Sequence, residues 1–154
     1  MSNVLLVTSP AIDAPNALAY ALRRAKELGA GLVGLAVLDP DVTQRVAAAL
    51  SNVGFVGEKV SESVVDTLAR EQRTQAEALL KRIAEEAGRA GIAFTALVEE
   101  GDPGEVCGRV IRTHRVQAAV LVAEKRSWLT RFLSRSAAVR LPSLAGCEVK
   151  VMEE

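Results

Sequence analysis

Short apolar runs recur along the chain, and the first of them, residues 4–7, has the pattern of a strand that is covered on both faces. Such runs are typical of parallel sheets, because helices pack on both sides of them. The predicted strands are residues 4–7, 32–38, 92–98, 118–122 and 149–151. In the last of these, apolar Val149 and Val151 alternate with polar residues, which indicates a strand at the edge of the sheet.

Segments with apolar residues at helical spacing separate most of these runs. The predicted helices are residues 14–28, 61–88 and 102–114. We expect Asp13 to cap the first helix and Gly29 to end it. In the third helix, Asp102 has the position of an N-cap, Pro103 that of the first helical residue and Glu105 that of a capping-box partner.

The alternation of strands and helices predicts one α/β domain over residues 1–154, with right-handed crossovers between parallel strands. Residues 41–60 fit neither pattern, because an Ala-rich turn is followed there by small polar residues. We expect this stretch to be a mobile excursion from the domain.

The composition excludes several classes of function. The chain has 19 basic and 19 acidic residues, so its net charge attracts neither nucleic acid nor an anionic membrane, and no apolar run is long enough to span a bilayer. Two cysteines, Cys107 and Cys147, are too few for a disulfide framework and suit the core of a cytoplasmic protein. With His114 as the only histidine, a metal site or a catalytic Cys/His pair lacks its components.

Several motifs, taken in order, resemble the universal stress protein family. They are the segment from Arg126 to Ser136, the following Ala-Ala-Val-Arg at 137–140, the final strand at 147–151, the Gly-Asp-Pro turn at 101–103, and Ala-Lys-Glu-Leu-Gly-Ala at 25–30. The resemblance covers essentially the whole chain. It implies a doubly wound, Rossmann-like fold of the adenine-nucleotide alpha-hydrolase type, with a five-stranded parallel sheet in the order 3-2-1-4-5 and helices on both faces.

The nucleotide loop of that family is altered here. Members that bind ATP carry Gly, two residues, Gly, nine residues, Gly and then Ser or Thr, because the backbone must approach phosphates closely. In this chain Ala123, Lys125 and Arg135 stand at the glycine positions, the first spacing is one residue shorter, and Ser136 is retained. At the end of the first strand, Ser9 replaces the acidic residue usual in the family.

The resemblance and the altered loop together favour a non-enzymatic, homodimeric stress-response or regulatory protein that contacts an unidentified protein partner and uses neither ATP nor another cofactor. The alternative is a binder of an adenine nucleotide or another phosphate ligand. Its candidate residues are Thr8, Ser9, Val37, Ala123, Lys125, Arg126, Arg135 and Ser136. An enzyme of the related nucleotide-activating families is a third reading, but the chain lacks a recognisable phosphate loop and catalytic pair.

Two further features near the carboxyl terminus have both a functional and an ordinary explanation. The basic residues of the loop region can bind a phosphate or an acidic partner, or can form a solvated surface; they are Lys125, Arg126, Arg131, Arg135 and Arg140. Trp128 can fill the altered cleft or anchor a partner, or can pack the loop on the last helix.

The family resemblance also implies a dimer in which the last strand pairs antiparallel with its copy. The expected interface residues are Glu148, Val149, Lys150 and Val151. With a two-fold axis near Val149, Glu148 would lie opposite Lys150 of the partner subunit. The alternative is that these charges protect the edge from pairing.

Overall fold

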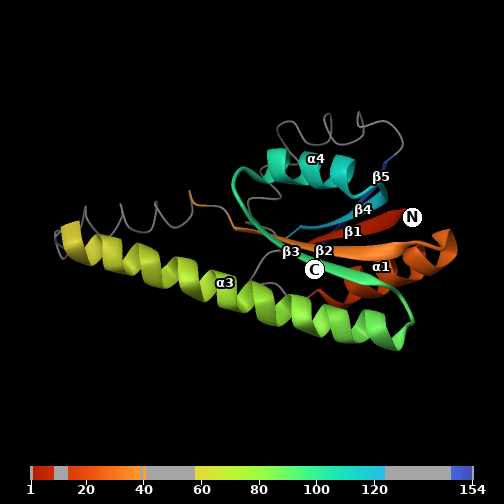
Figure 1. Cartoon of the computed structure of the whole chain (residues 1–154), viewed down its shortest axis with the longest axis horizontal. Helices are drawn as coiled ribbons and strands as arrows, with labels where there is room; N and C mark the ends of the chain where they lie inside the picture. Colours follow the sequence, from red (N-terminus) through yellow and green to blue (C-terminus); the bar gives the residue numbers. More distant parts are fainter. Residues whose placement is uncertain (1, 9–13, 39, 41–57, 124–146, 154) are drawn as a thin grey trace.

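Five parallel strands form one sheet in the order β3-β2-β1-β4-β5, with helices on both faces (Figure 1). The computed structural model describes residues 2–8, 14–38, 40, 58–123 and 147–153. The strands are β1 (Asn3–Thr8), β2 (Gly31–Leu38), β3 (Phe94–Glu100), β4 (Val116–Ala123) and β5 (Glu148–Glu153). The helices are α1 (Pro15–Leu28), α3 (Glu58–Arg89) and α4 (Pro103–Thr113). The predicted doubly wound order is therefore confirmed.

The alternation of side chains along the strands divides the interior into two cores. Even-numbered residues of the central strands, such as Leu6 and Leu32, pack against α1 and α3. Odd-numbered residues, such as Leu5 and Val33, pack against α4. Figure 1 shows α4 on one side of the sheet and the other two helices on the opposite side. Because both faces are buried, these strands read as continuous apolar runs.

α1 packs on the sheet through a stripe of alanines. Ala17, Ala21 and Ala25 recur every four residues and have no exposed surface, so the helix backbone lies close to the strands. Its amino-terminal cap differs from the prediction: the N-cap is Ala14, without a side-chain hydrogen bond, and Asp13 lies outside the described residues. Pro15 at the first helical position explains the shift, because proline starts a helix with its angle φ already set.

α3 is a 32-residue helix that begins three residues earlier than predicted. Residues 58–60, assigned above to the mobile excursion, are its first residues, and the rest of that excursion lies outside the described part. At about 1.5 Å per residue the helix is about 48 Å long, and it extends past the end of the sheet (Figure 1). Residues of its second half are buried against the sheet; they are Ala76, Leu79, Leu80, Ile83 and Ala87.

The amino terminus of α4 is capped as predicted. The Asp102 carboxylate accepts a hydrogen bond from the Glu105 backbone N–H at 3.1 Å, and Pro103 follows the cap. This bond satisfies one of the N–H groups that have no partner within the helix. It also places a negative charge at the positive end of the helix dipole.

Replacing the cap should weaken the fold measurably. We expect Asp102→Ala to lower the free energy of unfolding by about 1 kcal/mol, because the Glu105 N–H loses its acceptor. Asp102→Asn keeps an oxygen acceptor and should cost less. Urea denaturation followed by circular dichroism measures both variants, and equal losses would contradict a capping role.

Hydrogen bonds between Asn3 and the turn after α4 hold the amino-terminal ends of β1 and β4 together. The Asn3 backbone N–H donates to the Arg115 carbonyl at 3.1 Å, and its side-chain amide donates to the His114 carbonyl. Arg115 has φ of 52°, which lets the chain turn from α4 directly into β4. In the part of the chain that the structure describes, no helix is both long and apolar enough to cross a membrane.

Candidate functional site

The carboxyl ends of the parallel strands meet at the sheet edge where open α/β folds bind ligands. α4 begins at this edge, because the Gly101 N–H donates to the Leu38 carbonyl at the end of β2, at 3.1 Å. Gly101 has φ of 144°, a conformation that favours glycine at this turn. The positive end of the α4 dipole is thereby brought beside the ends of the strands.

Thr8 is the last residue of β1 and the only buried polar side chain among the described residues. It is 2% exposed, and its hydroxyl donates to the Leu35 carbonyl at 3.4 Å. The hydroxyl proton is thus directed to the neighbouring strand.

Val37 near the end of β2 is also buried, with 1% exposure, but it belongs to the core beneath α4. Thr8 shares the parity of Leu6, which packs toward α1 and α3. Because alternate residues of a strand point to opposite faces, these two candidate cleft residues lie on opposite faces of the sheet. Both residues lie near the carboxyl ends of their strands, but their side chains do not line the same side of one cleft.

Among the other predicted cleft residues, Ala123 alone lies in the described part of the chain. Ala123 ends β4 and pairs with Glu153 of β5, so its backbone lies at the expected edge. The predicted residues outside the described part are Ser9, Lys125, Arg126, Arg135 and Ser136, together with Trp128, Arg131 and Arg140. Among the described residues, the strand ends and the start of α4 make up the region of the expected cleft.

β5 lies at the edge of the sheet, as predicted, and α1 holds its first charged residue. The Glu148 carboxylate pairs with the Arg24 guanidinium at 2.7 Å, and Arg24 also contacts Glu27 at 3.0 Å. These hydrogen bonds, with Glu148 contributing most, raise the pKa of Arg24. Arg24 therefore connects two segments that are 124 residues apart.

The second charge of β5 is held against the same helix. Lys150 follows Glu148 on the same face of the strand, and its Nζ lies 5.3 Å from the centre of the Tyr20 ring. Arg23 lies at the same distance from that ring. Val151 points to the other face and is 43% exposed, the one exposed large hydrophobic side chain among the described residues. The edge thus presents ordered charges on one face and an apolar side chain on the other.

The two cysteines fit the predicted packing role. Cys107 is buried in α4, and this burial, aided by the negative charge of Asp102, raises its pKa to about 12. Cys147, just before β5, is half-buried, and burial followed by the Glu148 charge raises its pKa. Thiolates are the reactive form of cysteine, so both environments disfavour a nucleophilic role.

The buried thiol predicts a specific loss of stability at high pH. An unfolded cysteine ionises near pH 8.5, whereas folded Cys107 keeps its proton to about 12. Between these values the unfolded state binds fewer protons, so Cys107 lowers the free energy of unfolding by up to about 1.4 kcal/mol per pH unit as pH rises. Urea denaturation from pH 8 to 11 should show a steeper decline for the unaltered chain than for Cys107→Ala. Parallel declines would contradict this origin.

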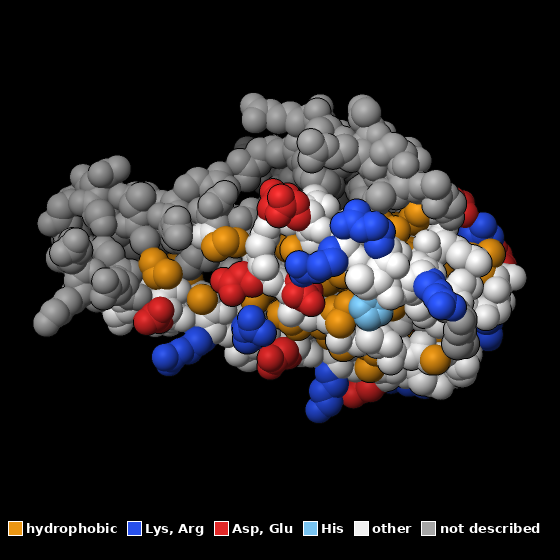
Figure 2. All heavy atoms as spheres, turned by 45° about the horizontal axis from the view of Figure 1, so that its top comes forward, with side chains coloured by type: hydrophobic (Ala, Val, Ile, Leu, Met, Phe, Trp, Pro, Cys, Tyr) orange, Lys and Arg blue, Asp and Glu red, His pale blue; other side chains and the backbone are white. Residues whose placement is uncertain are grey.

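Charged residues of both signs lie side by side on the described part of the face in Figure 2. This distribution agrees with equal numbers of basic and acidic residues. Within the described ranges, no three His, Cys, Asp or Glu side chains come together to hold a metal ion. The surface therefore offers local ion pairs rather than a broad field of one sign.

A comparison with protein families places the chain. The sequence model of the universal stress protein family matches residues 1–152. The chain belongs to this family. No curated protein sequence matches it, so the family assignment rests on the family model and agrees with the strand order described above.

Solved structures of universal stress proteins share the fold. A family protein from Burkholderia pseudomallei is 22% identical, with a TM-score of 0.66 over 98% of this chain and 95% of that one. UspA from Lactobacillus plantarum is 16% identical, with a TM-score of 0.66 over 98% and 97%. An Arabidopsis thaliana family protein with AMP bound is 13% identical, with a TM-score of 0.60 over 100% and 92%.

Sequence reasoning missed the contacts between α1 and β5 in this universal stress protein. Tyr20, Arg24 and Glu27 recur at helical spacing, which predicts a common outer stripe. Nothing in that spacing identifies Glu148 or Lys150 as neighbours, because the pairing depends on which strand α1 crosses. The signal that could have identified this pairing is the order of the strands. It places β5 next to β4, and α1 packs on β4.

Proposed function

We propose that this chain is a non-enzymatic, homodimeric stress-response protein of the cytoplasm, which acts through protein contacts and does not use ATP. The observation that carries the dimer is the edge strand β5, where Glu148 and Lys150 lie on one face with opposite charges. Two copies related by a two-fold axis near Val149 would place each Glu148 opposite Lys150 of the partner subunit. The strand is therefore complementary to itself.

The lack of ATP use rests on the amino-acid sequence after β4. Lys125 and Arg135 stand where ATP-binding relatives have glycines, and a side chain there opposes close approach of phosphate to the backbone. The spacing is also one residue shorter, so the remaining Ser136 would be displaced from its usual register. At the opposite strand, the Thr8 hydroxyl donates to a backbone carbonyl.

The proposal is tested by two measurements on the unaltered chain. Sedimentation at micromolar concentration should show a dimer, and calorimetry with ATP at physiological magnesium should show no saturable heat. A monomer would refute the homodimer, and saturable ATP binding would refute the second part independently. The double variant Lys125→Gly with Arg135→Gly tests the loop as the cause, because any ATP binding should increase in it.

A second candidate function is binding of a nucleotide through charged side chains of the altered loop. It is favoured by similar structures described with AMP bound and in complex with cAMP. An arginine can hold a phosphate with two parallel hydrogen bonds, which glycine cannot do. In this case Arg135→Gln should abolish binding of AMP measured by calorimetry, while Arg109→Gln on α4 should leave it unchanged.

A further inference from the structure

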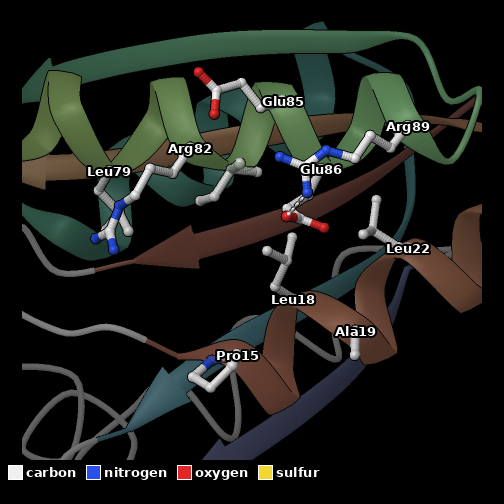
Figure 3. Close-up of a pocket in the computed structure, with 10 residues that line it drawn as sticks. Pro15, Leu18, Ala19, Leu22, Leu79, Arg82, Glu85, Glu86 and Arg89 are labelled. Atoms are coloured by element: carbon white, nitrogen blue, oxygen red, sulfur yellow. Dashed lines mark hydrogen bonds and ion pairs between the residues drawn. The ribbon is translucent and has the colours of Figure 1, made fainter.

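A hollow of about 540 Å³ lies between α1 and α3 (Figure 3). It exists because the two helices share only β2 and otherwise pack on different strands. α1 lies over β1, β2 and β4, whereas α3 lies over β2 and β3. The alanine stripe of α1 draws that helix toward the sheet and leaves few large side chains to fill the space between the helices.

The floor of this hollow is apolar. Leu79 and Ile83 of α3 are 5% and 3% exposed and close its inner side. Leu18 and Leu22 of α1 lie one turn apart across from them and are only half-buried. Figure 3 shows both leucines directed from α1 toward α3. A volume in this range with an apolar lining is typical of sites for small organic ligands.

The charged residues of the hollow are arranged unequally. Glu86 is matched by Arg89, whose guanidinium lies 2.6 Å from its carboxylate. Glu85 points away from the space, whereas Arg82 extends along the hollow near Leu79 (Figure 3). A guanidinium has five N–H donors, and a carboxylate uses at most two of them. Arg82 can therefore donate hydrogen bonds to an anionic ligand alongside its other interactions.

We propose that the hollow between α1 and α3 binds a small amphipathic monocarboxylate, with its apolar body over Leu18, Leu22 and Ile83 and its carboxylate at Arg82. The apolar floor selects for a hydrocarbon body, and the locally neutralised Glu86 leaves the arginine end complementary to an anion. The residues that line the hollow include none from β5 and none of the candidate nucleotide-binding residues. This site therefore stands or falls independently of the proposed dimer and of ATP.

Calorimetry with decanoate, below the concentration at which it aggregates, tests the proposal on the unaltered chain. Saturable binding of decanoate is expected, and decyltrimethylammonium, which has the same chain and the opposite charge, should bind at least about tenfold more weakly. Absence of saturable decanoate binding would overturn the proposal, and so would equal binding of the two probes.

Substitutions in α3 separate recognition from general charge effects. Arg82→Gln should weaken decanoate binding by about tenfold or more, because the charged donor is lost. Lys81→Gln makes the same change of charge on the neighbouring exposed residue, which does not line the hollow, and should leave binding within about twofold. Glu86→Gln should strengthen binding, because it releases Arg89 from its ion pair. Equal losses in the first two variants would overturn the proposal.

A substitution on α1 tests the location. Ala19 lines the hollow from an exposed position, so Ala19→Trp should fill the space without disturbing the core. Decanoate binding should then be lost, while circular dichroism and the urea midpoint remain close to those of the unaltered chain. Undiminished decanoate binding in a folded Ala19→Trp chain would overturn the assignment to this hollow.

Discussion

Chains carrying Glu148→Lys and chains carrying Lys150→Glu are expected to form heterodimers when mixed, although each variant alone dimerises poorly. With a two-fold axis near Val149, the first variant places its introduced ammonium group opposite Lys150 of the partner subunit, and the second creates two facing carboxylates. Each homodimer then contains two like-charge pairs, which should weaken it by about tenfold or more. In the mixed dimer, both pairs that face each other across the axis join an ammonium group to a carboxylate, so both are attractive.

Contacts within each chain should increase the loss of dimer affinity that the charge reversals cause. Glu148 is already held by Arg24, and Lys150 by Tyr20. A partner would therefore extend an ordered row of alternating charges instead of ordering two free side chains, so less conformational entropy is lost on association.

Sedimentation and native mass spectrometry of the separate and mixed variants measure this exchange of partners. The double variant Glu148→Lys with Lys150→Glu should recover the homodimer, because it restores opposite charges across the axis. Lys26→Glu, an exposed change of charge on α1, is the matched control and should leave the homodimer intact. If each single variant dimerises as well as the unaltered chain, the two-fold axis does not pass near Val149.

Gly34→Val is expected to cost about 1–3 kcal/mol of folding free energy, even though valine is a better strand former than glycine. A Cβ at Gly34 would lie 2.8 Å from Cζ of Phe94 and 3.0 Å from Cδ2 of Leu80. Both side chains belong to the core between the sheet and α3. Because Gly34 has no side chain, the Phe94 ring can pack against the strand at this position.

Urea denaturation measures this cost and its cause. Phe94→Leu in the Gly34→Val background should recover part of the loss, since a smaller side chain leaves room for the added methyl groups. Gly88→Ala is the contrasting control: nothing lies within 4 Å of a Cβ there, and alanine in a helix should add about 0.5–1 kcal/mol of stability. Additive losses from the two changes in Gly34→Val/Phe94→Leu would show that the Phe94 contact is not responsible.

The central strands could be predicted from sequence because burial on both faces leaves continuous apolar runs, as at residues 4–7. The N-caps of the helices were harder to predict than the strands. Asp102 was identified because its acceptor, proline and following glutamate form a local pattern, whereas Asp13 was chosen on composition and the helix begins from Ala14 instead. A local hydrogen bond can be predicted from sequence when all the residues that form it are neighbours in the chain.

The candidate sites show where sequence reasoning ends. The edge position of β5 follows from its alternating pattern, and the structure confirms it. The pairing of Glu148 with Arg24 could not be predicted, because it depends on how α1 crosses the sheet. The hollow beside Leu18 has the same origin: it reflects the space between two helices that share only β2 and otherwise rest on different strands.

The position of β1 at the centre of the sheet has a consequence for synthesis on the ribosome. β1 can pair with β2 as soon as residues 31–38 emerge, but its other edge waits for β4 at residues 116–123. Until then an apolar strand edge is open to other nascent chains, a situation that promotes aggregation. Because β5 joins only after β4, we expect subunit pairing to follow completion of the sheet rather than to guide it.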